Sequence, residues 1–293
     1  MSEFNEATLL EITDMLTTAT ENVEKVYGAG HSKGYQTGYT VGHQDGDESY
    51  YNQGYDAGKQ AEYDAFWDAF QNNKGNYQYT FCNYAWNDET FKPKYDIVFG
   101  RGYSGTNAFW GSYMTNIAES LEKLGRKMDT TLCGYWSSMF QGAKTKRIPE
   151  LNCTYASEYN ADYGLHNTFL NCELLETIDK MIVPEALKYT NTFNGCVNLK
   201  NIVFEGVIGE NISFQWSTKL SWGSIWNIAD HLSATTSGKT LTLSQAAVDE
   251  AFKYDMSYCD DAGNWVEYWI IGSEAGGWIE ICDTHPNWTI TLI

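Results

Sequence analysis

A repeated phrase in the middle of the chain constrains its fold more than any other feature. The clearest copies are TFLNCELLETI at 168–178 and TFNGCVNLKNI at 192–202, in which Phe, Cys, Leu and Ile recur at identical offsets, 24 residues apart. A unit of this length contributes one short strand and cannot bury its apolar face alone, so neighbouring units must cover it. The repeat therefore predicts a stack of short strands with a shared core.

Weaker copies extend the repeat toward the N-terminus. One contains Phe140 and Ile148, another begins at Ala108-Phe109, and a third is expected from Phe81 to Ile97. The periods of 24 to 29 residues fall in the range of leucine-rich repeats.

One position of the repeat is occupied by small apolar side chains. Cys172, Cys196 and Ala143 fall at the same offset from their phenylalanines, which predicts a buried core position. The seven cysteines are scattered without a CxxC pair, so free thiols are expected instead of a disulfide framework or a zinc site. A catalytic role for these cysteines is therefore not expected.

Residues 7–27 carry a heptad pattern. Apolar residues fill three a and three d positions, which are Leu9, Leu16 and Val23, and Ile12, Ala19 and Val26. The pattern favours a self-associating coiled coil, and Leu at a with Ile at d favours trimers or tetramers. The alternative is an amphipathic helix packed on its own domain.

Glycines then recur every fourth residue. They are Gly30, Gly34, Gly38, Gly42 and Gly46, followed after a gap by Gly54 and Gly58. On a helix they would form a bare stripe that lets another backbone approach closely. An irregular, tyrosine-bearing stalk is the alternative, because each glycine costs about 1 kcal/mol in a helix interior.

The C-terminal 81 residues differ from the repeats. Helices are expected at 221–232 and 244–254, the second capped by Ser244, and strands at 239–243, 266–271, 278–281 and 288–293. An array of repeats must be closed by an atypical unit, and this segment has the position for it. Trp216, Trp222, Trp226 and Phe214 are assigned to this cap.

These patterns together predict an α+β chain with three regions. Residues 1–75 would form a long helix or coiled coil for oligomerisation and attachment, 76–212 a short leucine-rich-repeat-like solenoid, and 213–293 an α/β C-terminal cap.

Charge and composition limit the classes of partner and ligand that the chain is expected to bind. The 19 basic and 38 acidic residues give a net charge of −19, which argues against binding to nucleic acid or to an anionic membrane. No apolar run approaches the ~18 residues of a membrane-spanning helix, and Met1 to Glu6 lacks the basic start of a signal peptide. None of the five histidines lies at a metal-ligand spacing, so neither a metal nor a cofactor is expected.

The segment TFNGCVNLKNIVFEGVIGENI at 192–212 resembles BspA-type leucine-rich repeats. Its continuation, with SFQWSTKL, TTSGKTLTLSQAAVDEAF and the ending HPNWTITLI, is similar to a group of such proteins encoded by phages and prophages of gut Firmicutes. The resemblance covers residues ~55–293. It implies a right-handed solenoid, a place on a phage tail or another virion appendage, and no enzymatic activity, cofactor or defined site residues.

The resemblance implies a non-enzymatic virion structural protein that contributes to attachment or host-surface binding. Its partners would be other copies of itself, other virion proteins, and a glycan or protein of the host surface. A tail-associated carbohydrate-active enzyme and an intracellular interaction scaffold are the alternatives. Aromatic side chains near the repeat edges could stack on sugars, although each could instead pack in the core. These candidates are Tyr103, Trp110, Tyr113, Trp136, Tyr155 and Tyr159.

Overall fold

The computed structural model describes only part of the chain. The described residues are 60, 61, 64, 67, 68, 77, 80–82, 87–89, 91–101, 105–156, 164–252, 257–259, 265–267, 281 and 283–293. The chain divides into two compact units, Met1–Gly75 with Pro93–Tyr95, and Asn76–Lys92 with Asp96–Ile293. In the first unit, Lys94 forms ion pairs with Asp68 at 3.0 Å and with Asp64 at 3.7 Å.

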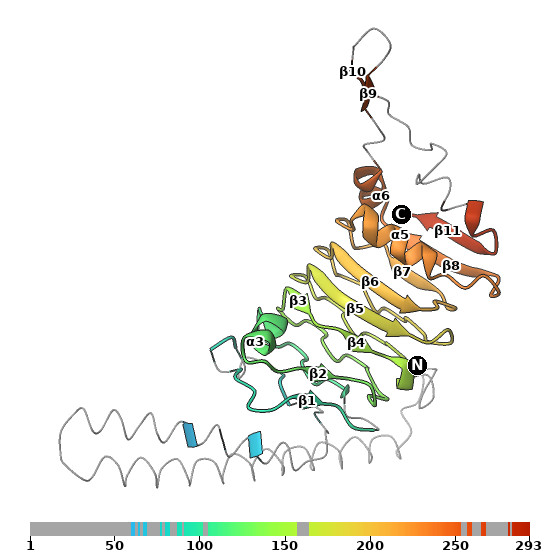
Figure 1. Cartoon of the computed structure of the whole chain (residues 1–293). Helices are drawn as coiled ribbons and strands as arrows, with labels where there is room; N and C mark the ends of the chain where they lie inside the picture. The colour runs from blue at the N-terminus through green and yellow to red at the C-terminus, as the bar shows by residue number, and fades with distance from the viewer. Residues whose placement is uncertain are drawn as a thin grey trace, which may run out of the picture. The chain divides into compact units, whose positions relative to one another are not determined.

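The second unit is built mainly from short parallel strands (Figure 1). β1 pairs with β2, β5 pairs with β3, β4 and β6, and β8 pairs with β7 and β11, all in parallel, whereas β9 and β10 form an antiparallel pair. The strands are β1 (Ile97–Val98), β2 (Met128–Asp129), β3 (Arg147–Ile148), β4 (Leu151–Asn152), β5 (Thr177–Val183), β6 (Asn201–Gly206), β7 (Ile212–Phe214), β8 (Lys239–Leu243), β9 (Ser257–Cys259), β10 (Trp265–Glu267) and β11 (Trp288–Leu292). The helices whose bounds lie within the described residues are α3 (Ile117–Lys123), α5 (Trp222–Asp230) and α6 (Gln245–Ala251).

The predicted fold class, an α+β chain that begins with a long helix or coiled coil, is wrong for the described part of the chain. Its helices with described bounds are seven to nine residues long, and short parallel strands dominate. The long helix was predicted for residues 1–75, most of which lie outside the described residues. In the described part, apolar residues alternate along strands, as in β6, and meet in turns. The predicted oligomerisation residues lie outside the described residues, and these are Leu9, Ile12, Leu16, Ala19, Val23, Val26, Gly30, Gly34, Gly38 and Gly42.

A column of stacked phenylalanine rings forms the centre of the core. Successive ring centroids are 4.5–5.6 Å apart and the rings are within 9–21° of parallel. The column contains Phe81, Phe109, Phe140, Phe169, Phe193 and Phe214, each at most 1% exposed. The prediction that Phe140, Phe169 and Phe193 are core positions of the repeat is confirmed. The column also continues into Phe214, which the sequence pattern assigned to the cap.

Cysteine side chains join two of the turns to the turns before them. Cys172 Sγ donates to the carbonyl oxygen of Phe140 at 2.8 Å, and Cys196 Sγ donates to that of Phe169 at 3.1 Å. Both thiols are buried, as predicted, and burial raises the pKa of Cys172 to about 12. A thiol with so high a pKa stays protonated at neutral pH, so it serves packing rather than nucleophilic chemistry.

Four of the turns, those of Phe109, Phe140, Phe169 and Phe193, contain two residues in the left-handed region, placed symmetrically around the phenylalanine. The residue two positions before it has φ of 53–55°, and the residue two positions after it has φ of 58–78°. Asparagine and glycine tolerate this conformation best, and they fill seven of these eight positions. The four pairs are Asn107 and Gly111, Ser138 and Gly142, Asn167 and Asn171, and Asn191 and Gly195.

The strands carry the second apolar layer of the repeat. Ile148, Ile178 and Ile202 are in register across β3, β5 and β6, and none of them is exposed. This pairing places the recurring isoleucines at equivalent core positions.

The C-terminal elements lie close to their predicted bounds. β8 covers the predicted 239–243, and β11 ends one residue before the predicted end. Ser221 caps α5, since its Oγ accepts a hydrogen bond from Ser224 N at 3.3 Å. Ser244 occupies the N-cap of α6 without a side-chain capping bond. Of the predicted strand 278–281, only Ile281 is described, and it is helical.

Helix α3 lies within the interval between two stacked phenylalanines. Its buried face consists of Ile117, Ala118 and Leu121. Arg147 on β3 joins it to the sheet, because its guanidinium lies 2.8 Å from Glu122 on the helix and 2.7 Å from Asp179 on β5. These partners raise the pKa of Arg147 above its ordinary range, with the Asp179 hydrogen bond as the largest cause.

A single carboxylate organises the turn between α5 and β8, and it makes stability depend on pH. Glu185 Oε1 accepts hydrogen bonds from Ser233 Oγ at 2.5 Å and Thr236 Oγ1 at 3.1 Å, which hold the pKa of Glu185 below its ordinary value of 4.5. A lowered folded pKa stabilises the fold above the unfolded pKa, and this contribution is lost as pH falls through the folded pKa. We expect Glu185→Gln to lower the urea midpoint at pH 7 and to leave a smaller difference at pH 3. The exposed Glu173→Gln is the control, and an equal deficit of Glu185→Gln at both pH values would contradict the argument.

Candidate functional site

The six aromatic residues expected to bind a partner are in different environments. Tyr103 and Tyr159 lie outside the described residues. Trp136 is fully buried, and its Nε1 donates to the carbonyl oxygen of Cys133 at 3.0 Å. The prediction that Trp136 is a recognition residue is therefore wrong, because its ring and its indole N–H both make contacts within the core.

Trp110 and Tyr113 remain available to a partner. They follow the core residue Phe109 in its turn and are 41% and 55% exposed. Tyr155 is half-buried, and the guanidinium carbon of Arg101 lies 5.4 Å from its ring centroid, a cation–π geometry. Two of the six predicted residues are thus exposed in one turn of the repeat array.

Exposed tryptophans also occur where the sequence pattern placed a packed cap. Trp216 is 50% exposed and Trp222 is 51% exposed, and the rings of Trp222 and Trp226 are 6.0 Å apart. The apolar stripe of α5 is instead made by Ile225 with Ile228 and Ala229. The helical period alone does not predict the exposure of Trp222, because Trp222 lies three residues before Ile225 and seven before Ala229, on the same side of the helix.

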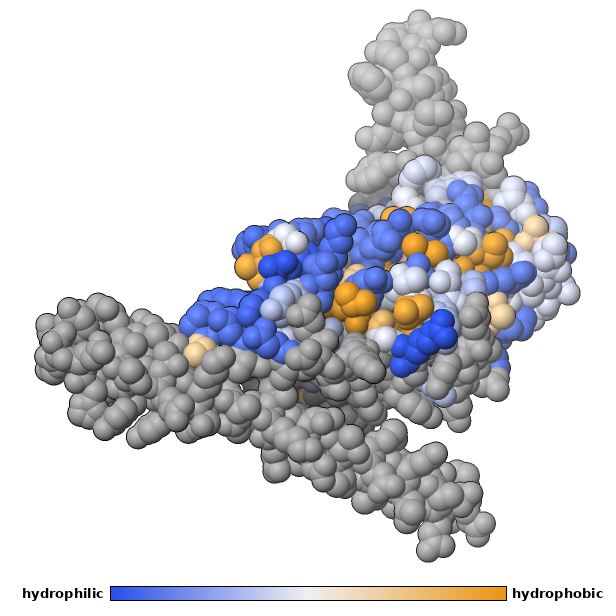
Figure 2. Space-filling model, turned by 60° about the horizontal axis from the view of Figure 1, so that its bottom comes forward, coloured by the Kyte–Doolittle hydropathy of each residue, from blue (hydrophilic) through white to orange (hydrophobic). Residues whose placement is uncertain are grey.

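Hydrophobic side chains do not merge into one large patch on the face shown in Figure 2, where orange areas are separated by hydrophilic ones.

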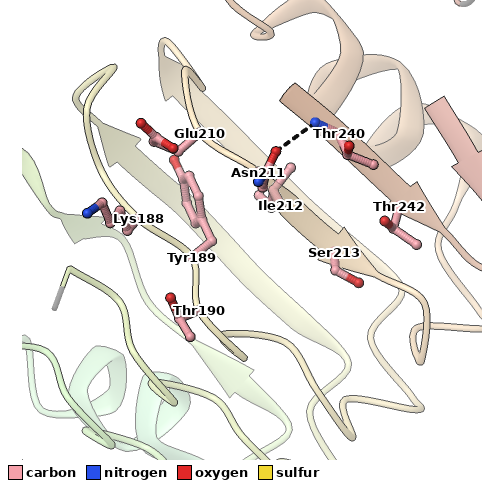
Figure 3. A pocket seen from close by; sticks show the side chains of 9 residues that line it. All are labelled: Lys188, Tyr189, Thr190, Glu210, Asn211, Ile212, Ser213, Thr240 and Thr242. Carbon is pink, nitrogen blue, oxygen red and sulfur yellow. Dashed lines mark hydrogen bonds between the residues drawn. The ribbon is translucent and has the colours of Figure 1, made fainter. Parts of the chain in front are cut away.

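A polar recess lies beside the first strands of the C-terminal sheet (Figure 3). It has a volume of about 380 Å³ and is formed by three segments that are distant in sequence. The lining residues are Lys188, Tyr189, Thr190, Glu210, Asn211, Ile212, Ser213, Thr240 and Thr242. No sequence motif marked them, because each segment contributes only two to four residues.

The charged and amide groups of the recess are held in place. Lys239 Nζ lies 2.6 Å from the Glu210 carboxylate. Asn211 Oδ1 accepts a hydrogen bond from Thr240 N at 2.8 Å, which fixes the orientation of the side-chain amide.

Tyr189 is the one lining residue whose polar group is buried without a partner. Its side chain is 5% exposed, its ring contacts Phe204 edge-on, and its hydroxyl forms no hydrogen bond within the described part of the chain. Burial raises the pKa of Tyr189 well above its ordinary value, so the hydroxyl is protonated and can both donate and accept.

The recess suits binding better than acid–base chemistry. Glu210 is its single carboxylate, whereas glycoside hydrolysis ordinarily uses two. Across the described residues, no cluster of three or more His, Cys, Asp or Glu side chains could hold a metal ion. Within the same part of the chain, no helix has the length and apolar character needed to cross a bilayer.

Comparisons with known proteins complete the description of the site. No protein-family model, no curated protein and no solved structure matches this chain.

Proposed function

We propose that the chain is a non-enzymatic structural protein of a phage virion, placed on the tail or another appendage, that contributes to attachment or host-surface binding through its repeats. The observation that carries the proposal is the exposure of Trp110 and Tyr113 on a turn whose backbone is fixed by the stacked core. Aromatic anchors on a rigid scaffold bind with little loss of conformational entropy. The resemblance of residues ~55–293 to phage-encoded repeat proteins supports the place on the virion.

The alternative of a tail-associated carbohydrate-active enzyme is less well supported. The polar recess has one carboxylate, which is paired with Lys239, and the thiols of Cys172 and Cys196 are buried and protonated. The discriminating experiment is incubation with host cell-wall polysaccharide. Release of sugar that is abolished by a single Asp or Glu substitution would replace the binding proposal with an enzymatic one.

The place on the virion is tested by mass spectrometry of purified particles. We expect peptides of this chain at a constant ratio to other virion proteins across the density-gradient peak. Absence of the chain from infectious particles would contradict the proposal and favour the intracellular scaffold.

Host-surface binding is tested on the exposed turn. We expect the double substitution Trp110→Ala and Tyr113→Ala to weaken adsorption of the protein to host cells by at least about tenfold, because exposed aromatic anchors dominate such interfaces. Flow cytometry of cells incubated with labelled protein measures the loss. The matched control is Trp216→Ala, which removes an equally exposed tryptophan elsewhere. Equal adsorption by the double variant and the wild type would exclude this turn as the contact.

A further inference from the structure

We infer that the recess formed by residues 188–190, 210–213 and 240–242 binds one sugar residue of a neutral glycan. The inference deepens the proposed function and rests on it, since it names the ligand class of a host-surface binding protein. Figure 3 shows the lining side chains converging from a loop and two neighbouring strands.

The volume of the recess fits a small ligand. At about 380 Å³ it lies at the lower end of the roughly 300–1,000 Å³ typical of small-molecule sites. It is open to the surface, so a ring inside it could remain linked to the rest of a polysaccharide.

The strand register arranges the hydroxyl groups in a row. Side chains alternate between faces, so Ile212 and Leu241 are buried while Ser213 and Thr242, which are paired across β7 and β8, face the recess. Thr190 and Thr240 add further hydroxyls. Hydroxyls both donate and accept hydrogen bonds, as do the hydroxyls of a sugar, so the two sets are complementary.

The charges favour a neutral ligand. Glu210 already forms an ion pair with Lys239, and Lys188 is the only basic residue of the lining. A phosphate site ordinarily gathers several cationic or backbone donors, and a calcium site six to eight oxygen ligands. The recess has neither set.

Saturation-transfer NMR on the full chain tests the inference, with glucose, galactose, N-acetylglucosamine and rhamnose as probes and glucose 6-phosphate as the anionic comparison. We expect at least one neutral sugar to bind, and Ser213→Ala and Thr242→Val each to weaken its binding about tenfold, the loss of one good hydrogen bond.

Thr289→Val is the matched control, because Thr289 is paired with Thr240 on the adjacent strand but does not line the recess. We expect it to bind the sugar like the wild type. The inference is overturned if no neutral sugar binds, if glucose 6-phosphate binds more tightly than glucose, or if the recess variants bind as well as the control.

The two proposals fail in different ways. If the protein adsorbs to host cells but the recess variants bind sugar as well as the wild type does, only the proposed sugar site in the recess is refuted. If the recess variants lose sugar binding but the chain is absent from purified particles, only the proposed place on the virion is refuted.

Discussion

Phe169→Ala is expected to lower the free energy of unfolding by about 3–5 kcal/mol, the usual cost of deleting a fully buried phenylalanine. The ring of Phe169 lies 5.6 Å from Phe140 on one side and 5.6 Å from Phe193 on the other. Its loss therefore leaves a cavity between two repeats and removes ring contacts on both faces. Urea denaturation followed by tryptophan fluorescence measures the change.

The control for this substitution is the next residue in the same turn. Leu170 is only half-buried, and its backbone hydrogen bond to Asn167 is retained in an alanine variant. We expect Leu170→Ala to cost less than about 1 kcal/mol. If both variants lost the same stability, the phenylalanine column would not be the energetic centre of the core.

Gly206→Ala should have a comparably large effect through the backbone. Gly206 ends β6 with φ of 100°, and an added Cβ would collide with the carbonyl oxygen of Val183 on β5. Unfavourable φ and overpacking together should cost about 3 kcal/mol. A lower urea midpoint and faster hydrogen exchange of the β5 and β6 amides are the expected readouts.

Gly223→Ala provides the matched comparison, since a Cβ at Gly223 meets nothing within 4 Å and the residue lies within α5. Alanine favours helix over glycine by up to about 1 kcal/mol, so this variant should be neutral or slightly more stable. A wild-type midpoint for Gly206→Ala would show that the β5–β6 edge can shift to admit a methyl group.

The repeats were predictable from sequence where their copies were complete. Phe169 and Phe193 each precede a cysteine by three residues, and the same offset holds Ala143 after Phe140. The repeat at Phe214 was missed because its small residue at this offset is Ser217, which is nonetheless fully buried. The small size of Ser217 could have identified this repeat, because a serine side chain fits where a cysteine or alanine side chain does.

The candidate sites were less predictable. Trp110 and Trp136 look alike as aromatic residues of repeat turns, yet one is 41% exposed and the other is not exposed at all. Which side of a short turn faces the core depends on backbone angles that composition does not encode. The recess joins Tyr189 with Ser213 and Thr242 across some 50 residues, so only the stacking and register of the strands bring them together.

In the phenylalanine column, the number of residues between successive phenylalanines varies, whereas the distance between their rings hardly changes. The chain spends 21 residues between Phe193 and Phe214 but 31 between Phe109 and Phe140, while the ring spacing stays at 4.5–5.0 Å for both pairs. The additional residues of the longer interval include α3 and the turn at Gly125, where nothing lies within 4 Å of an added Cβ. Loops grafted at this turn could therefore vary in length and sequence while the axial rise per repeat stays the same, which makes the array a scaffold for diversified surface loops.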